Sequence, residues 1–289
     1  MTGEEEWIRR HVRPTEPIEL AYERSWARVW RVPVAGGVVW FKACAPVQAF
    51  EPWLTVALAS RWQDRLPEVI ASNEEQAWLL LADAGTPLMA FGDQLDAWLA
   101  ILPRYAELQR GEAAHVAEHL AGGVPDRRLE ALPEQYEGLV ARDLPLEPEE
   151  LAALRAFGPA FAGLCSELGT RGIPPSIQHD DLHAANVYAR DGRLAVLDWG
   201  DACISHPFFS LVATLHNEAR RVPFTRLRDA YLEPWGADPD TFELALRIGW
   251  FAYAIAWLRQ YDHLERDEDR ADFAREFAKV LRLAYSAAT

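Results

Sequence analysis

The stretch that decides the fold runs from Gln178 to Asp201 and reads QHDDLHAANVYARDGRLAVLDWGD. Within it, Asp181 is followed five residues later by Asn186, and Asp198 comes twelve residues after that. Two short runs with strand character lie between these groups, joined by an Asp-Gly turn. A hairpin of this kind places the three polar groups at one edge of one supersecondary unit.

The order of these polar residues is the one that phosphoryl transfer from a nucleotide needs. The pattern is H-x-D-x-x-x-x-N, followed at a strand end by a hydrophobic residue and Asp-x-Gly. One carboxylate, Asp181, accepts or orients the proton of an attacking hydroxyl. Asn186 and Asp198 supply oxygen ligands of the kind that Mg²⁺ prefers.

In these residues the chain resembles the aminoglycoside phosphotransferase and choline kinase group of the protein-kinase-like fold. The loop of that group typically reads H-G-D-L-H-x-x-N and its metal strand I-D-W-G, whereas this chain has Asp180 in place of the glycine. The resemblance implies a nucleotide donor, ATP or GTP, and a role for each matched residue. These roles are Asp181 as catalytic base, Asn186 and Asp198 as magnesium ligands, and His179 and His183 as supporting residues that hold the loop by hydrogen bonds.

A lysine in the N-terminal part of the chain is a candidate to bind the phosphates of the nucleotide. Lys42 and Lys279 are the only lysines among 29 Lys plus Arg. Lys42 ends a strand-like run, where the kinase fold uses a lysine to neutralise the α and β phosphates, and Glu51 lies near the start of the next helical pattern, where its partner carboxylate belongs. A solvent-exposed lysine and a helix-dipole glutamate are the alternatives. We expect Lys42 and Glu51 to pair.

Two further nucleotide contacts are expected, one to phosphate and one to the base. The turn between the first two strands, near residues 23–26, contains no glycine. Many members of the group that the chain resembles have a serine-containing loop here, so the resemblance implies that Ser25 contacts phosphate through its hydroxyl or backbone N–H. The base is expected against backbone groups of residues 80–83, beside Leu81. Backbone contacts leave no side-chain signature, so ATP and GTP both stay open.

The segment after the Asp-Trp-Gly motif departs from the group. Its members usually carry Gly-Asp-Pro followed by Asp-Leu, whereas residues 205–211 read SHPFFSL. The carboxylate that often braces the catalytic loop is therefore missing. We expect His206 or Ser210 to take its place.

The pattern along the chain predicts an α+β protein of two lobes. Residues 1–83 carry strand signals around one helical segment and form the expected N-lobe, with strands at 18–22, 27–34, 38–41, 68–71 and 77–82 and a helix at 47–62. Residues 84–289 form a mostly helical C-lobe with long 3.6-period stretches at 95–109, 151–168 and 242–259, with loops expected at 125–128 and 143–148. The resemblance implies that this architecture is the two-lobed protein-kinase-like fold, with a small antiparallel sheet in the N-lobe.

The composition of the chain limits the classes of molecule that it is expected to bind. The 289 residues carry a net charge of −15, which repels nucleic acid and anionic membranes and favours cationic small molecules. The three cysteines form no C-x-x-C pair, and no apolar run is long enough to span a bilayer, so we expect a protein of the cytoplasm.

The expected function is Mg²⁺-dependent transfer of the γ-phosphoryl group of ATP or GTP to a hydroxyl of a small molecule. The alternatives are a catalytically silent kinase-like fold that binds a nucleotide or metabolite, a protein kinase, and a metallohydrolase that uses the clustered His and Asp residues around Asp181. The acceptor is left open. The aromatic stripe Trp250, Tyr253, Trp257 and Tyr261 could line its site, but such a helix face is more often core.

Overall fold

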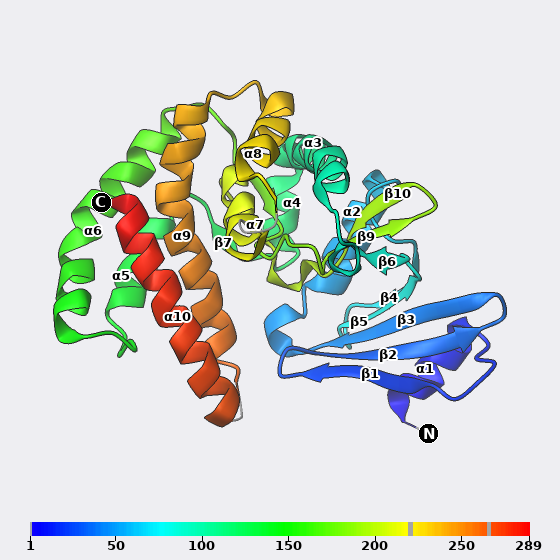
Figure 1. The fold of residues 1–289 in the computed structure, drawn as a ribbon. Coiled ribbons are helices and arrows are strands. Elements are labelled where there is room, and N and C mark those ends of the chain that lie inside the picture. The colour runs from blue at the N-terminus through cyan, green and yellow to red at the C-terminus, as the bar shows by residue number, and fades with distance from the viewer. Residues whose placement is uncertain (1, 219–221, 265–266) are drawn as a thin grey trace. The chain divides into compact units, whose positions relative to one another are not determined.

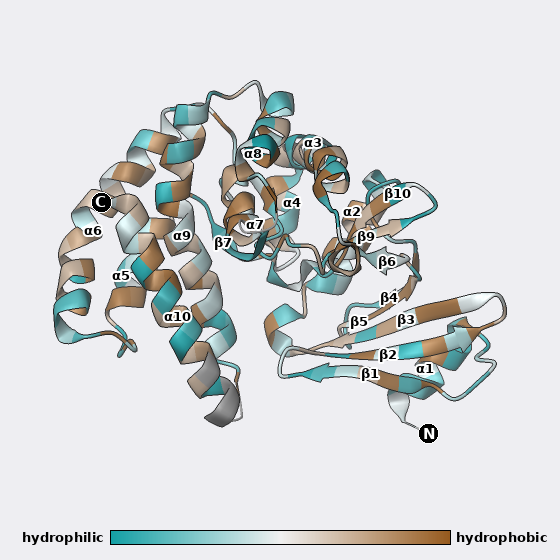
Figure 2. Ribbon diagram, in the orientation of Figure 1, coloured by the Kyte–Doolittle hydropathy of each residue, from teal (hydrophilic) through white to brown (hydrophobic). Residues whose placement is uncertain are grey.

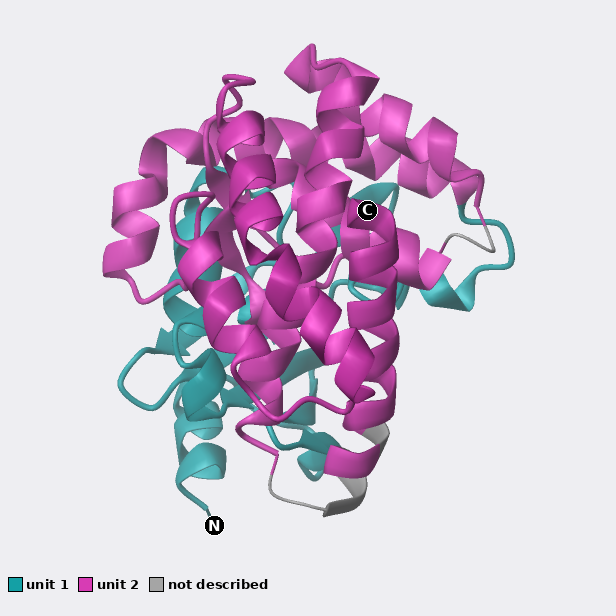
Figure 3. Ribbon diagram, turned by 90° about the vertical axis from the view of Figure 1, so that its left-hand side faces the viewer, with its two compact units in different colours: residues 1–94, 184–200 teal, residues 95–183, 201–289 magenta. Residues whose placement is uncertain are grey.

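The computed structural model describes residues 2–218, 222–264 and 267–289. The chain forms two compact units: unit 1 comprises residues 1–94 and 184–200, and unit 2 comprises residues 95–183 and 201–289 (Figure 3). The predicted α+β class is confirmed. Unit 1 thus includes the hairpin that follows the candidate catalytic loop, while the lobe boundary predicted after residue 83 stays a prediction.

Unit 1 is built on a five-stranded antiparallel sheet with strand order β1-β2-β3-β5-β4 (Figure 1). The strands are β1 (Glu19–Arg24), β2 (Ala27–Val34), β3 (Gly37–Cys44), β4 (Val69–Asn73) and β5 (Trp78–Ala82). Each corresponds to a strand predicted from the alternation of apolar residues. The Gly36-Gly37 turn joins β2 to β3, and Gly36 has the positive φ of 91° that glycine adopts freely.

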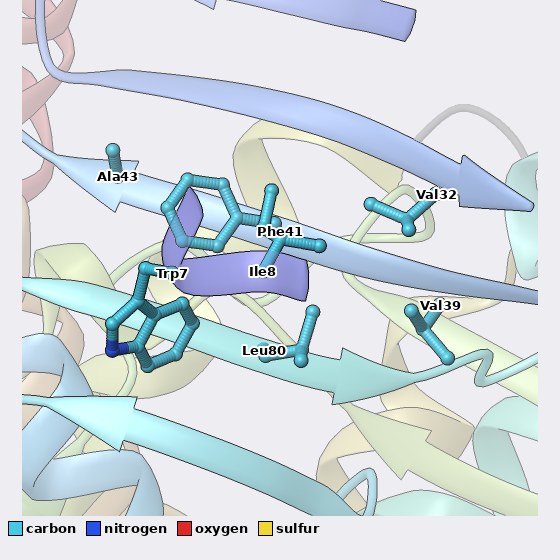
Figure 4. Close-up of a cluster of buried hydrophobic side chains, with 7 residues drawn as sticks. All are labelled: Trp7, Ile8, Val32, Val39, Phe41, Ala43 and Leu80. Carbon is cyan, nitrogen blue, oxygen red and sulfur yellow. The ribbon is translucent and has the colours of Figure 1, made fainter. Parts of the chain in front are cut away.

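One face of this sheet is covered by α1 (Gly3–His11), an N-terminal helix that the sequence reading missed. Trp7 and Ile8 of α1 pack against Phe41 and Leu80, and Val32, Val39 and Ala43 complete the buried cluster (Figure 4). Successive strand residues point to opposite faces. Because Phe41 points into this core, Lys42 next to it points to the other face.

The rest of unit 1 consists of helical segments between β3 and β4 and a second sheet formed by later residues. The short 3₁₀ segment Pro46–Gln48 precedes α2 (Glu51–Arg61), where one helix was predicted. A second sheet has the order β10-β9-β6, with β6 (Thr86–Pro87), β9 (Val187–Arg190) and β10 (Arg193–Val196). The predicted hairpin of β9 and β10 is therefore confirmed, and a 3₁₀ turn at Leu88–Ala90 follows β6.

Unit 2 is mostly helical, as predicted. Its helices are α3 (Leu95–Glu112), α4 (Val116–Ala121), α5 (Leu132–Val140), α6 (Pro148–Gly169), α7 (Ser210–Glu218), α8 (Phe224–Leu232), α9 (Pro239–Tyr261) and α10 (Asp267–Ala288). Hydrophilic and hydrophobic residues alternate along α10, as expected for a helix with one solvent-facing side (Figure 2). No helix in the described ranges combines the length and apolar character needed to cross a membrane.

A three-stranded sheet in unit 2 supports the candidate catalytic loop. Its order is β7-β11-β8, with β7 (Asp126–Arg127), β8 (Ser176–Gln178) and β11 (Cys203–Ser205). The prediction of a plain loop at residues 125–128 was wrong, because two residues are too few to show a strand period. They pair in parallel with β11 across a long sequence separation.

Buried side chains fix β8 within unit 2. The Gln109 side chain of α3 is fully buried, and its Nε2 donates to the Ile177 carbonyl at 2.8 Å and to Ser210 Oγ at 3.0 Å. Its Oε1 accepts from the Tyr231 hydroxyl at 2.5 Å. A buried amide whose donors and acceptor are paired rigidifies the strand from which the loop departs.

The aromatic stripe of α9 belongs mainly to the core. Trp250 and Tyr253 are buried against the His216 ring of α7, with ring centroids 6.0 Å away in both cases. The core interpretation is therefore confirmed for these two residues. Trp257 and Tyr261, farther along the stripe, are only half-buried and contact Phe273 of α10.

His206 should make the stability of the protein pH-dependent. Its buried ring accepts from the Phe208 N–H through Nδ1 at 3.3 Å, which puts the proton of the neutral ring on the unpartnered Nε2. Burial lowers the pKa of His206 to about 3, so the unfolded state binds more protons below pH 6.5 and stability falls as the pH drops. We expect its contribution between pH 7.5 and 5 to be on the order of 2 kcal/mol.

Urea unfolding at these two pH values checks this contribution. His206→Asn keeps an acceptor for the Phe208 N–H and removes the titration, so its free energy of unfolding should fall less on acidification than that of the unaltered protein. An equal fall in both proteins would show that His206 does not control this pH dependence.

Candidate active site

Lys42 lies between two carboxylates in unit 1. Its Nζ is 2.6 Å from Glu51 Oε2 and 2.5 Å from Asp198 Oδ1. Cys44, two residues further along β3, donates its thiol proton to the same Glu51 oxygen at 3.3 Å. The structure thus brings together three of the residues singled out in the sequence, from a strand, a helix and the end of the β9–β10 hairpin.

Burial and charge act in opposite directions on this cluster. Burial alone would lower the pKa of Lys42, but the Asp198 and Glu51 carboxylates raise it well above its ordinary value, so the ammonium stays charged. Burial raises the pKa of Glu51 against the attraction of Lys42. With both carboxylates ionised, the cluster carries one more negative than positive charge and is suited to bind a cation.

Asp198 and Asn186 offer the kind of oxygen donors that would hold a magnesium ion. Asp198 has a φ of 63°, in the left-handed region where non-glycine residues are rare, and its side chain is 47% exposed. The Leu197 N–H donates to the Asn186 carbonyl at 2.9 Å, which ties the two candidate ligands together. Carboxylate and amide oxygens are hard donors that suit Mg²⁺.

Gly200 of the same motif is required by close packing. A Cβ at this position would lie 2.4 Å from Cδ of Gln48, whose side chain is buried. The glycine therefore allows the 3₁₀ segment Pro46–Gln48 and the end of the hairpin to come together within unit 1.

A cavity of about 480 Å³ in unit 1 contains this cluster. Its lining includes five residues that the sequence predicts for a nucleotide site, namely Lys42, Glu51, Leu81, Asn186 and Asp198. Ser25 is not among its lining residues, so its phosphate contact stays a prediction without geometric support. Several aromatic residues that the sequence reading missed also line the cavity, namely Tyr22, Trp26, Trp40 and Tyr188.

Strand periodicity could have identified one of these aromatic residues. Trp40 precedes Lys42 by two positions on β3 and so shares its face. Its indole N–H donates to Asp83 Oδ1 at 3.1 Å, and Arg190 donates to the Asp83 carbonyl at 2.6 Å. The segment predicted to hold the base is therefore fixed by side chains from β3 and β9.

Tyr188 also lines the cavity. Burial raises its pKa, and the charges of Asp198 and Asp83 raise it further. Within unit 1, the Tyr188 phenol is therefore influenced both by the candidate metal ligand Asp198 and by Asp83, in the segment expected to hold the base.

The candidate base lies in unit 2, on the loop that follows β8. Asp181 is 34% exposed, and His183 Nε2 is 3.2 Å from its Oδ2. A carboxylate only accepts hydrogen bonds, so His183 carries the proton in this contact. The Asp181 N–H donates to Nδ1 of the buried His179 at 3.3 Å. Both histidines predicted to hold the loop do contact Asp181.

Other residues of unit 2 anchor the loop on both sides of Asp181. The His179 N–H donates to the Tyr105 hydroxyl at 3.0 Å, which is hydrogen-bonded at 2.9 Å to Ser210. The Leu182 carbonyl accepts from the Thr214 hydroxyl at 2.7 Å. Ser210 thus acts on the loop through Tyr105, a residue that the sequence reading missed.

His206 does not take the place of the missing carboxylate. Its Nδ1 accepts from the nearby Phe208 N–H, and its ring packs on Phe208 and Phe209. The expectation that His206 braces the loop is therefore not supported by its contacts.

Asp180 anchors the loop through a buried ion pair. Its carboxylate accepts from Arg127 of β7 and, at 2.6 Å, from Gln178 Nε2. Burial raises the pKa of Asp180 to about 6, although Arg127 and Gln178 favour its ionised form. At pH 7 the carboxylate is therefore mostly ionised and paired.

These contacts disfavour the metallohydrolase alternative. His179 Nδ1 and both Asp180 oxygens are engaged by hydrogen-bond donors of unit 2, which leaves them poorly suited to converge on one metal. Within the described part of the chain, no group of three or more His, Cys, Asp or Glu side chains forms a metal cluster.

Solved structures share this fold. The wild-type aminoglycoside 2'-phosphotransferase-IIIa in its GDP complex superposes over all of both chains with a TM-score of 0.68 at 16% identity. Choline kinase LicA from Streptococcus pneumoniae gives 0.65 at 12% identity, over 98% of this chain and 100% of that one. Macrolide 2'-phosphotransferase MphH from Brachybacterium faecium gives 0.62 at 18% identity, over 96% and 95%.

Sequence comparison agrees with the structural one. No curated protein matches the chain in sequence. The model of the phosphotransferase enzyme family, however, matches residues 2–246, which include Lys42, Asp181 and the Asp-Trp-Gly motif. Since that match covers most of its length, the chain belongs to the phosphotransferase enzyme family, as its resemblance to aminoglycoside phosphotransferases and choline kinases implied.

Proposed function

We propose that the protein is a Mg²⁺-dependent phosphotransferase that moves the γ-phosphoryl group of ATP or GTP to a hydroxyl of a small molecule. The observation that supports this most strongly is the pairing of Lys42 with Glu51 and Asp198 in a cavity also lined by Asn186. A buried ammonium beside an oxygen-donor pair matches what a metal–triphosphate complex requires.

Each residue of unit 1 has a distinct part in holding the nucleotide. Lys42 binds phosphate oxygens, and Glu51 holds the ammonium in place. Asn186 and Asp198 would hold Mg²⁺, which when bound neutralises charge on the phosphates. The cavity's aromatic residues exclude water from the donor, which strengthens these charge interactions.

Asp181 of unit 2 orients the acceptor. The acceptor oxygen attacks the γ-phosphorus as the bond from that phosphorus to the β–γ bridging oxygen breaks. The hydroxyl proton passes to the Asp181 carboxylate, and the nucleoside diphosphate leaves with the electron pair of the broken bond. The protein contributes mainly positioning and charge neutralisation, since the phosphoryl-transfer transition state needs little covalent participation by protein groups.

The acceptor is a hydroxyl-bearing small molecule. The solved relatives are named for aminoglycosides, macrolides and choline, which differ widely in size and charge. The net charge of −15 suits an acceptor with a cationic part.

Asp181→Asn tests the assignment of the base. Phosphate release from Mg·ATP or Mg·GTP, with water as the acceptor, should fall by about 10²–10⁴-fold, because general-base assistance is lost. The KM for nucleotide should stay the same, since the cavity residues lie in unit 1.

Asp191→Asn is the matched control. Asp191 lies in the exposed turn between β9 and β10 at a φ of 51°, a conformation that asparagine tolerates. It should keep full phosphate release. Unchanged release by Asp181→Asn would contradict the base assignment.

Asp198→Asn tests the metal site. Asparagine tolerates the left-handed backbone at this position, so a change in binding reports the lost carboxylate and not strain. Isothermal titration calorimetry should show that Mg²⁺ no longer tightens ATP or GTP binding. A variant that binds Mg·ATP as the unaltered protein does would place the metal elsewhere.

A further inference from the structure

The residue just before the candidate base is unusual in both conformation and charge. Asp180 has a φ of 65°, in the left-handed region, and its carboxylate is buried. Arg127, which pairs with it, is buried as well. The related loops described above carry glycine here, a residue that adopts this φ without a side chain to bury.

We propose that the Arg127–Asp180 ion pair positions Asp181 for catalysis. The inference rests on the proposed function, because it concerns the base of that reaction. Both side chains are buried and would act through Asp181, so they are positioning residues.

The contacts of the loop show why this pair controls Asp181. His179 is anchored through its backbone N–H and Leu182 through its carbonyl. Asp180 lies between them and is anchored through its side chain. Fixing this side chain sets the peptide that joins Asp180 to Asp181, and hence the direction in which the Asp181 N–H meets His179 Nδ1.

The position of Arg127 is itself fixed. β7 pairs with β11 in parallel, and the Ser205 hydroxyl donates to the Arg127 carbonyl at 2.7 Å. The guanidinium therefore reaches the loop from a strand that is already held in the sheet. Removing one partner of a buried pair leaves an uncompensated charge, so variants that retain the fold must be compared with a doubly neutral one.

Asp180→Asn separates charge from backbone conformation, because asparagine tolerates the left-handed region while losing the ion pair. With water as the acceptor, we expect kcat for phosphate release from Mg·ATP or Mg·GTP to fall by about 10- to 100-fold, as for a displaced catalytic group. The nucleotide KM should not change. Arg127→Lys, which keeps a charge at this position, should recover part of kcat relative to Arg127→Gln.

Arg128→Gln is the matched control. Arg128 follows Arg127 directly and forms a more exposed ion pair with Asp126 at 2.8 Å. It should leave kcat within about twofold of the unaltered protein, since exposed pairs contribute little. A comparable loss in Arg128→Gln would show that any lost charge on this strand has the same effect, and would overturn the proposal.

The double variant Arg127→Gln, Asp180→Asn covers the case in which a single variant fails to fold. Stability restored with kcat still low supports positioning by the ion pair. Stability and kcat both restored would show that the single variants suffered only from an unpaired buried charge, which overturns the proposal. A folded Asp180→Asn variant whose kcat stays within about twofold of that of the unaltered protein would also overturn the proposal.

Hydrogen exchange gives a readout that does not depend on activity. Amides of residues 179–183 should exchange faster in Asp180→Asn while those of α9 do not, and equal protection in this loop would overturn the proposal.

Asp181→Asn in the same phosphate assay distinguishes the ion-pair proposal from the assignment of Asp181 as the base. If Asp181→Asn is inactive and Asp180→Asn is not, the ion-pair proposal alone fails; if Asp181→Asn is fully active, the base assignment fails and exchange alone decides on the loop.

Discussion

The ammonium of Lys42 stays charged although its side chain is only 12% exposed, because two carboxylates lie beside it. Burial favours the neutral amine, and the attraction of Asp198 and Glu51 reverses this preference. The consequence is a surplus of negative charge where a metal–triphosphate complex would bind. Asp198 therefore has two partners in the proposed reaction, the lysine in the protein alone and the metal when nucleotide is present.

The position of this lysine depends on the core on the opposite side of the sheet. Strand alternation sends Phe41 into the cluster with Trp7 and Ile8, which leaves Lys42 to face the cavity. A shift of one residue in the β2–β3 register would exchange the two faces and bury the ammonium among apolar side chains. Packing of α1 and chemistry at the cavity are therefore coupled through one strand.

Much of the candidate site could be predicted from the sequence because it is local. Asp181, Asn186 and Asp198 lie within eighteen residues, and their spacing carries the chemistry. Lys42 was identified by the scarcity of lysine. Arg127 could not be identified, since its partner Asp180 lies 53 residues away and β7 is too short to show a period.

Other parts of the fold were missed for similar physical reasons. The acidic residues at the start of α1 make its apolar face hard to recognise in the sequence. Tyr105 acts through a hydrogen bond between its hydroxyl and the backbone of a loop that is distant in sequence. Backbone contacts and tertiary hydrogen bonds leave little trace in local sequence. The expected contact of Ser25 came from family resemblance, and the cavity is instead lined by its neighbour Trp26.

The central claim is that the Lys42 cluster binds a nucleotide through a metal. The most direct measurement is the thermal unfolding midpoint with ATP or GTP, each with and without Mg²⁺. Ligand at about 100 times its Kd adds about 2.7 kcal/mol of stability, a rise in Tm of about 2–4 °C for a chain of this size. We predict such a rise with at least one nucleotide only when Mg²⁺ is present. No rise with either nucleotide, or an equal rise without the metal, would contradict the account.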